Sequence, residues 1–426
     1  MDNSREAQLA NLRALIKKID DQPQRSAFYT LNATKKRMSI SARIFRKAYR
    51  PDSFVAWRTS FVPSEILFSL NIVPFPAETV MAMFASSRLA ADLLGIAEEN
   101  HCSRDACSFL RGTVGASIAN VLPTPDFLIC TSLYCDGSAK TFYSLSKRYN
   151  KPYFFIDIPY EYNLDYSIKY VASQLEAIMK KMAKSMGTSI DYGRLSQVIR
   201  DANEARDYFE AVLKLRQAVP SPMLGGEAID YATMLSHIWG SKEAVALYKM
   251  LYDELKERVD SKKGAIDEER YRIIWRQLRP YYTDEIFRYL ELQNKAIIVF
   301  EEANYMHWDR MDPDDPFISL AKKLLSNPPL GPVKRWRDAS IKCIKDYKAD
   351  GVVEFAQWGC RHLNSGTQIL KEKLRDMDIP ILVLDGDCVD RRDYSWAQFK
   401  TRIDAFLEIL QQKKINKGAD YAIRRS

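Results

Sequence analysis

The feature that most constrains the fold of this chain is a pattern of segments that occurs twice. Each copy consists of an apolar run, a cysteine, a helical stretch, and a proline before the next apolar run. The cysteine and the proline are Cys135 and Pro152 in the first copy, and Cys360 and Pro380 in the second. They are separated by 17 residues in one copy and by 20 in the other. Short apolar runs that alternate with helical segments indicate βαβ units and a parallel sheet.

We therefore predict an α/β fold with two related parallel-sheet domains that face each other. Because ligands bind at the carboxyl edge of an open parallel sheet, each domain offers its cysteine to a shared crevice. At 426 residues the chain is also too long for a single core. The predicted division is a helical N-terminal region (1–55), a first α/β domain (56–165), a mainly helical middle insertion (166–293) and a second α/β domain (294–426).

The apolar runs and helical periods predict the individual elements. Strands are expected at 72–76, 126–130, 152–159, 296–300, 351–356 and 379–385. Helices are expected at 109–122, 137–148, 168–182, 243–262 and 398–413, and residues from about 165 to 293 have an almost wholly helical pattern. A further helix is expected to start at Pro63-Ser64-Glu65, because proline and an acidic residue both favour the first turn.

The bulk composition is that of an ordinary globular protein, with 46% hydrophobic and 28% charged residues. No apolar run approaches the roughly 20 residues that a membrane helix needs, and the polar N-terminus lacks a signal-peptide core. We therefore expect a cytoplasmic protein whose seven cysteines are reduced thiols, not a disulfide framework. No Walker A sequence is present, which excludes ATP hydrolysis by that route.

The net charge of +8 is spread along the chain without a block of five or more like charges. Nucleic acid is therefore not the expected partner. An anionic CoA ester as substrate, or an acidic protein partner, accounts for the same charge balance.

Three cysteines are the main candidates for chemistry: Cys107, Cys135 and Cys360. Each precedes a helical stretch, and a helix N-terminus lowers the pKa of a thiol and makes it a better metal ligand. Three thiolates in one crevice suit a metal centre that keeps one ligand position open. The ordinary alternative is that each is a small buried residue, which is the commonest role of a free cysteine.

The other four cysteines are expected to be structural. Cys130 ends an apolar strand and Cys343 lies on an amphipathic helix. Cys102 and Cys107, like Cys130 and Cys135, are separated by four residues, a spacing that leaves a zinc site open as an alternative. Cys388, which lies between Asp387 and Val389, is also expected to be structural.

Two further side chains are candidates for catalytic roles. Glu78 follows a predicted strand and could supply an oxygen ligand to the open position, although an exposed loop carboxylate is the simpler interpretation. His362, beside Cys360, could donate a proton, with a surface histidine as its alternative. The glycines of the segment 111–115 follow a helix start and not a strand, so they indicate helix packing and not a dinucleotide site.

With these residues in view, the chain resembles the subunits of 2-hydroxyacyl-CoA dehydratases and of the related ATP-dependent benzoyl-CoA reductases. The resemblance runs from about residue 55 to 410. Its segments are 61–67, 71–74, 106–109, 130–137, 358–361, 379–387 and 401–408.

The resemblance implies two Rossmann-like domains and a [4Fe–4S] cluster held by Cys107, Cys135 and Cys360, with Glu78 where a carboxylate ligand is suggested for some members. It implies a lyase that eliminates water from a 2-hydroxyacyl-CoA through a ketyl radical, under anaerobic conditions. It also implies two protein partners: a related second subunit, in a heterodimer or alternatively a homodimer, and an ATP-dependent iron–sulfur activator that delivers single electrons.

Three other functions stay open at this point. The chain could belong to an aromatic-ring reductase of the benzoyl-CoA reductase type, which shares these motifs. It could be a non-catalytic, electron-relaying paralogue of the catalytic subunit. From another class, it could be a zinc-stabilised α/β binding protein, which metal analysis would distinguish from the iron–sulfur proteins.

Overall fold

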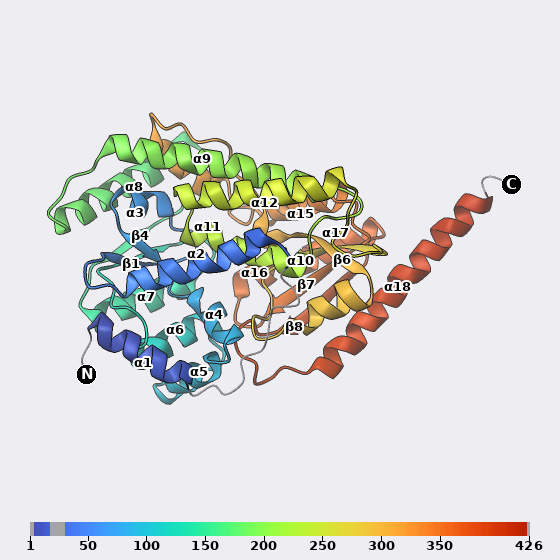
Figure 1. Ribbon diagram of the computed structural model, residues 1–426, viewed down its shortest axis with the longest axis horizontal. Coiled ribbons are helices and arrows are strands. Elements are labelled where there is room, and N and C mark those ends of the chain that lie inside the picture. The colour runs from blue at the N-terminus through green and yellow to red at the C-terminus, as the bar shows by residue number, and fades with distance from the viewer. Residues whose placement is uncertain (1–3, 18–29, 424–426) are drawn as a thin grey trace.

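The computed structural model describes residues 4–17 and 30–423, and it contains two four-stranded parallel sheets (Figure 1). The strand orders are β2-β1-β3-β4 in the first sheet and β6-β5-β7-β8 in the second. The two orders correspond strand for strand, so the second sheet repeats the connectivity of the first. The predicted α/β fold with two parallel-sheet domains is confirmed.

The strands of the first sheet are β1 (Val55–Arg58), β2 (Val73–Phe75), β3 (Phe127–Thr131) and β4 (Tyr153–Ile156). Those of the second sheet are β5 (Tyr271–Arg276), β6 (Ala296–Glu301), β7 (Gly351–Gln357) and β8 (Ile381–Gly386). Every residue of the two central strands β1 and β3, and of β5 and β7, is buried. Burial on both faces is the usual state of a parallel strand between helices.

The repeated sequence pattern corresponds to two equivalent units. The first is β3, then α7 (Asp136–Tyr149), then β4. The second is β7, then α16 (Arg361–Ser365) and α17 (Thr367–Asp376), then β8. In both units the two strands are parallel neighbours in their sheet. The prediction of two related βαβ units is therefore confirmed.

The remaining helices lie around the sheets. They are α1 (Arg5–Lys17), α2 (Asn32–Ala48), α3 (Ser64–Ser69), α4 (Val80–Ser86), α5 (Ala90–Glu99), α6 (Ser108–Ile118), α8 (Asp165–Ser185), α9 (Tyr192–Leu215), α10 (Gly225–Ala228), α11 (Met234–His237), α12 (Lys242–Asp260), α13 (Glu285–Phe287), α14 (Pro316–Leu325), α15 (Val333–Asp346) and α18 (Trp396–Ile423). The described residues also contain three short helical turns: 3₁₀ turns at Ile229–Thr233 and Glu302–Asn304, and a π-helical turn at Arg288–Gln293. The N-terminal helices agree with the predicted helical region, although the part of that prediction at residues 18–29 lies outside the described residues.

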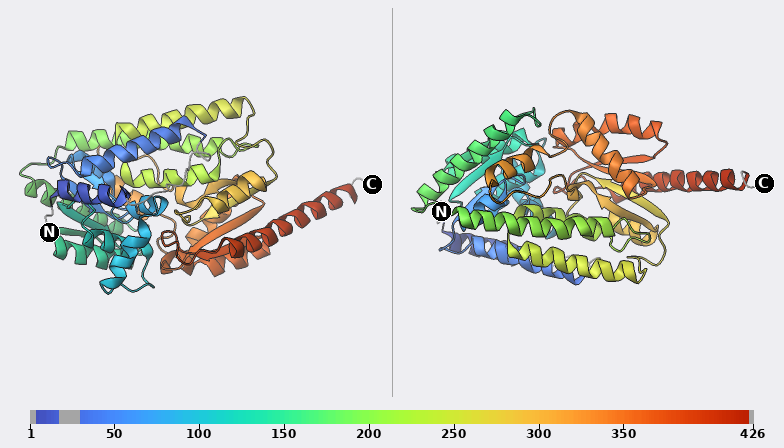
Figure 2. Two further views of the ribbon diagram at one scale, coloured as in Figure 1. Left: turned by 60° about the horizontal axis from the view of Figure 1, so that its bottom comes forward. Right: turned by 90° about the horizontal axis from the view of Figure 1, so that it is seen from above.

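Helix α9 connects the two sheets (Figure 2). Near its start, Arg194 donates a hydrogen bond to the carbonyl of Phe68 at 3.2 Å. Just beyond its end, Arg216 donates to both carboxylate oxygens of Glu301, on β6, at 2.7 and 2.8 Å. A helix of this length extends about 36 Å, so it can be anchored to one domain at each end, with α12 packed alongside it. The helical middle segment therefore fixes the two sheets relative to each other.

Two strands are absent from the sequence prediction. Strand β5 lies within 165–293, a stretch with an almost wholly helical pattern, and β1 lies across the predicted boundary at residue 55 between the N-terminal helical region and the first α/β domain. Both strands carry arginines that are buried in the structure: Arg58 in β1, and Arg272 and Arg276 in β5. A charged residue in a short apolar run makes the run look unlike a buried strand. In the structure, acidic partners lower the cost of burying these arginines; Glu269, for example, lies 2.5 Å from Arg272. The residue boundaries of the four predicted regions remain predictions.

The final helix is longer than predicted. Its first part packs on the second sheet, where Phe406 lies against Gly351 at the start of β7, and its later part extends away from the body of the protein (Figure 1). Across the described residues, no single helix has the length and apolar character to cross a membrane, although α4 and α5 meet that test as a pair bent by 118°.

Close packing of α5 against α6 gives a stability prediction. A Cβ atom added at Gly115 of α6 would lie 1.8 Å from the carbonyl oxygen of Leu93, whereas one added at Gly95 of α5 would meet nothing within 4 Å. We expect Gly115→Ala to lower the free energy of unfolding by roughly 1–3 kcal/mol, because the helices must move apart. Gly95→Ala, the matched control, should leave it unchanged or raise it by about 0.5–1 kcal/mol. Urea denaturation measures both, and equal effects would contradict the packing account.

Candidate metal centre at the facing sheet edges

A cavity of about 350 Å³ lies where the carboxyl ends of the two sheets meet. Its lining includes residues at or just after the end of six strands: Arg58 at the end of β1, Glu78 after β2, Cys135 after β3, Arg276 at the end of β5, Glu302 after β6 and Cys360 after β7. Cys107, from the start of α6, lines the same cavity. The three predicted cysteines are thus brought together from both domains.

Each of the three thiols sits at the N-cap of a helix. Cys107 precedes α6, Cys135 precedes α7 and Cys360 precedes α16. At each sulfur, the backbone N–H groups two and three residues further on oppose the effect of burial on the thiol pKa: those of Phe109 and Leu110, of Gly137 and Ser138, and of His362 and Leu363, respectively. The Ser138 N–H lies 3.3 Å from the Cys135 sulfur. Backbone N–H groups at three helix N-termini thus offset part of the rise in thiol pKa that burial causes, and one of them, the Ser138 N–H, is hydrogen-bonded to its sulfur.

Close backbone approaches hold the three thiols near one another. A Cβ atom added at Gly359 would lie 2.5 Å from the Cα of Cys107, so the turn before Cys360 packs directly on the first domain. A Cβ at Gly137 would lie 2.9 Å from the Leu110 side chain, which limits the distance between the starts of α6 and α7. Glycine is therefore required at position 359, where the opposing atoms are backbone, whereas at position 137 the opposing atom is the end of a flexible side chain.

The Cys135 and Cys360 corners also contact each other through their neighbours. Arg361 and Asp136 form an exposed ion pair at 2.8 Å. The rings of Tyr134 and His362 stack with their centroids 5.0 Å apart and an interplanar angle of 30°. These pairs join the loops of two different sheets beside the thiols.

Behind the thiols, a buried polar network joins the domains. The Ser108 hydroxyl, next to Cys107, donates to Asp387 at 2.6 Å. Gln357, at the end of β7, donates to the same carboxylate at 3.2 Å, and the N–H groups of Val389 and Asp390 donate to it at 2.7 Å. One carboxylate after β8 thereby fixes the start of α6 and the end of β7.

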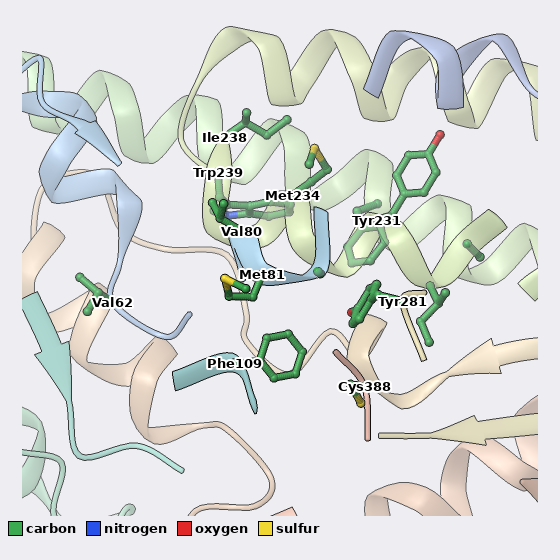
Figure 3. Close-up of a cluster of buried hydrophobic side chains, with 14 of the residues drawn as sticks. Val62, Val80, Met81, Phe109, Tyr231, Met234, Ile238, Trp239, Tyr281 and Cys388 are labelled. Atoms are coloured by element: carbon green, nitrogen blue, oxygen red, sulfur yellow. The ribbon is translucent and has the colours of Figure 1, made fainter. Parts of the chain in front are cut away.

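The apolar layer beneath this network continues the core. Phe109, two residues after Cys107, packs edge-on against Tyr281 with a centroid distance of 6.1 Å. The Tyr281 N–H donates to the carbonyl of Cys388 at 2.8 Å. Figure 3 shows these three residues together with Met81 of α4 and Tyr231. The thiols are therefore supported by packed side chains from both domains.

The charge state of the three thiols determines whether they can bind a metal. Burial raises the pKa of Cys107 to about 12, with Cys135 and Cys360 contributing, and burial likewise raises the pKa values of Cys135 and Cys360. Three thiolates lining one cavity would be stabilised by a positive charge, which a metal centre supplies. Among the described residues, no group of three or more His, Cys, Asp and Glu side chains is arranged to hold a metal ion.

Glu78 lies beside Cys135, as its position after β2 allows. Its carboxylate accepts hydrogen bonds from the Ser60 N–H at 2.8 Å, the Ser60 hydroxyl at 2.9 Å and the Ser138 hydroxyl at 3.0 Å. It lines the cavity together with the three thiols. Its position is thus fixed by three hydrogen bonds.

His362 is placed differently. It does not line the cavity, although its neighbours Cys360 and Leu363 do. Burial lowers the pKa of His362, while Asp136 opposes that effect. Its ring is therefore mainly neutral near pH 7 and lies against Tyr134, outside the cavity wall.

The other cysteines differ from one another. Cys130 and Cys388 are buried, and Cys102 is half-buried. Cys343, also predicted to be structural, is buried but lines the cavity on its α15 side.

Among the polar residues of the cavity wall that were not predicted from the sequence are Arg58, Arg276, Gln277 and Glu302. They lie at the carboxyl ends of β1, β5 and β6. That position would have indicated them as site residues, had β1 and β5 been recognised as strands.

The comparisons with known proteins agree with this geometry. Residues 59–410 match the family described as 2-hydroxyglutaryl-CoA dehydratase, D-component. The chain is 25% identical over 373 residues to the (R)-phenyllactyl-CoA dehydratase alpha subunit of Clostridium sporogenes, covering 84% of this chain and 90% of that one. It is 25% identical over 381 residues to the (R)-2-hydroxyisocaproyl-CoA dehydratase alpha subunit of Clostridioides difficile, covering 85% and 92%. It is 23% identical over 390 residues to a benzoyl-CoA reductase subunit of Thauera aromatica, covering 84% and 89%.

Two parallel-sheet domains with a thiol-lined cavity between their carboxyl edges define an α/β enzyme of the acyl-CoA dehydratase and reductase type. The chain belongs to the 2-hydroxyglutaryl-CoA dehydratase D-component family, since the match covers most of its length. The resemblance found in the sequence is confirmed.

The buried network gives a second stability prediction. We expect Asp387→Ala to lower the free energy of unfolding by roughly 3 kcal/mol, because it leaves several buried donors unpaired. The control is Asp253→Ala, which removes an exposed pair with Lys249 at 2.6 Å and should change stability by less than about 0.5 kcal/mol. Chemical denaturation compares the two variants, and a loss at position 387 as small as the control's would refute the role given to this carboxylate.

Proposed function

We propose that Cys107, Cys135 and Cys360 together hold a [4Fe–4S] cluster that has one iron without a cysteine ligand. The observation that carries this proposal is that three helix N-termini, from both domains, present three thiols to a single cavity. Cysteine thiolates are the usual ligands of such clusters, and hydrogen bonds to the sulfurs tune their potential.

Glu78 is the proposed ligand or neighbour of the open iron. It is a carboxylate beside Cys135 that is oriented by Ser60 and Ser138. An oxygen ligand binds iron less firmly than a thiolate, so substrate can displace it. His362 lies outside the cavity wall, and any proton transfer from it would require a path past Tyr134.

The proposed reaction is the elimination of water from a 2-hydroxyacyl-CoA. When bound, the cluster supplies single electrons at low potential and an iron that acts as a Lewis acid. One electron on the thioester carbonyl gives a ketyl radical anion, which expels the neighbouring hydroxyl and acidifies the hydrogen at carbon 3. The electron is recovered at the end, so that loss of water is redox-neutral overall. The buried, mostly apolar cavity serves this chemistry by excluding water.

Two protein partners follow from this proposal. The relatives are named as single subunits of their enzymes, which supports a multi-subunit enzyme with a related second subunit. The electron comes from a separate ATP-dependent iron–sulfur activator, since the chain has no Walker A sequence. The net charge of +8 favours binding of the CoA phosphates or of an acidic surface on a partner protein. Binding of either ligand should therefore weaken as the salt concentration rises.

A ring reductase is the second candidate. The similarity to a benzoyl-CoA reductase subunit supports it. The thiol positions alone do not distinguish dehydratases from ring reductases. An electron-relaying paralogous subunit would keep the same fold and thiols without turnover. An activity assay separates these functions by product.

In that assay, anaerobically purified protein, with its second subunit, is given 2-hydroxyacyl-CoA esters or benzoyl-CoA, an ATP-dependent iron–sulfur donor, MgATP and a strong reductant. We expect ATP-dependent formation of the 2-enoyl-CoA and none when the donor or ATP is omitted. Turnover by the isolated chain without ATP would contradict the proposal, and reduction of benzoyl-CoA alone would support the ring reductase instead.

Single replacements of the thiols test the ligand set. We expect Cys107→Ala, Cys135→Ala and Cys360→Ala each to lose the brown absorbance and most of the iron, because two thiolates cannot hold a cluster that already has an open site. Cys130→Ala is the matched control, because Cys130 is a buried cysteine that does not line the cavity. Full iron occupancy in the Cys360→Ala variant would overturn the ligand assignment.

A further inference from the structure

The cavity extends away from the thiols into a lobe between β6 and α15. Phe300 of β6, Tyr305, and Trp336, Ala339 and Cys343 of α15 line this lobe. Phe300 and Tyr305 meet edge-on at 6.4 Å, and Cys343 and Trp336 are buried. We call this set the α15 lobe. Its walls are aromatic and aliphatic groups, apart from one thiol that burial keeps uncharged, since the pKa of Cys343 is raised to about 12.

The charged groups next to the lobe are paired with each other. Arg276 lies over the ring of Trp336 at 4.7 Å and forms ion pairs with Glu302, at 3.3 Å, and with Glu354. Glu302 also accepts hydrogen bonds from the Trp336 indole, from Ser340 at 3.2 Å and from the N–H of Gln277 at 3.3 Å. The Arg276 guanidinium is thereby engaged within the wall by two carboxylates, those of Glu302 and Glu354.

The other cations along the described cavity wall are engaged as well. Lys323 pairs with Glu65 at 2.7 Å. Arg58 is 1% exposed and donates to the carbonyl of Ser60 at 2.7 Å and to that of Val62. Burial lowers the pKa of His307 to about 3, so its ring carries no charge at neutral pH. A substrate carboxylate in the α15 lobe would have to draw one of these cations from its present partners or stay unpaired, and an unpaired buried charge is costly.

From these contacts we infer that the α15 lobe receives the acyl side chain of the substrate, and that this side chain is uncharged and apolar, either branched aliphatic or aromatic. This inference rests on the function proposed above. The thioester carbonyl has to lie at the thiol end, and the charged CoA portion stays in solvent, which leaves the buried lobe for the acyl group. A cavity of about 350 Å³ is within the range of small-ligand sites.

Ala339 sets the length of side chain that the lobe accepts. It is the smallest side chain that α15 contributes to the lobe, and it lies between Trp336 and Cys343 along the helix. A larger residue there fills space that the acyl group would occupy. Such a larger residue at position 339 leaves the thiol end of the cavity open, where a short acyl group lies.

Binding of four CoA esters tests the inference on the anaerobically purified enzyme by isothermal titration calorimetry. The esters are 2-hydroxyacyl-CoAs whose side chains are a methyl group, a branched alkyl group, a phenylmethyl group and a chain ending in a carboxylate. We expect the branched or phenyl ester to bind at least about tenfold more tightly than the carboxylate ester. Equal or tighter binding of the carboxylate ester would overturn the inference and leave the proposed function intact. Failure of all four esters to bind would overturn the proposed function itself.

The variant Ala339→Phe tests the placement of the acyl group. We expect it to weaken binding of the branched and phenyl esters by about tenfold while the methyl ester binds as before. The matched control is Ala397→Phe, at an exposed alanine of α18, which should change none of the four affinities. Unchanged binding of the larger esters to Ala339→Phe would contradict the lobe assignment, and the comparison of esters on the unmodified protein stands even if the variant does not fold.

Discussion

The contact on which the site depends is the approach of the Gly359 backbone to Cys107. With only 2.5 Å between the Cα of Cys107 and an added Cβ, no other residue fits at position 359 without moving one domain from the other. This contact places the N-cap of α16 beside the N-cap of α6, so that thiols from two domains share one cavity. The Asp387 network and the rod-like helix α9 hold the domains in that relation.

The two domains contribute differently to the cavity although their sheets have the same strand order. The first domain supplies two thiols and the carboxylate of Glu78. The second supplies one thiol and the apolar α15 lobe, with its arginine engaged by two glutamates in the wall. Most of the reactive groups therefore come from the first domain, whereas the apolar surface proposed to bind the acyl group comes from the second.

Much of this could be predicted from the sequence. The repeated strand–cysteine–helix–proline pattern indicated both βαβ units, and the rule for carboxyl edges placed Cys135, Cys360 and Glu78 at one cavity. The buried arginines of β1 and β5 could not be read in this way, because a charge in a short run signals exposure unless its partner is known. Glu269 is near Arg272 in sequence, but Glu354 is 78 residues from Arg276. The α15 lobe was missed for a related reason, since Phe300 and Ala339 belong to distant segments that only the fold brings together.

The central claim is that thiols from two facing sheet edges hold one four-iron cluster. The most direct test is the iron, acid-labile sulfide and zinc content of the anaerobically purified chain, with electron paramagnetic resonance of the reduced protein. The account predicts about four irons and four sulfides per chain and the signal of a reduced [4Fe–4S] cluster. One zinc per chain, without sulfide or such a signal, would contradict it.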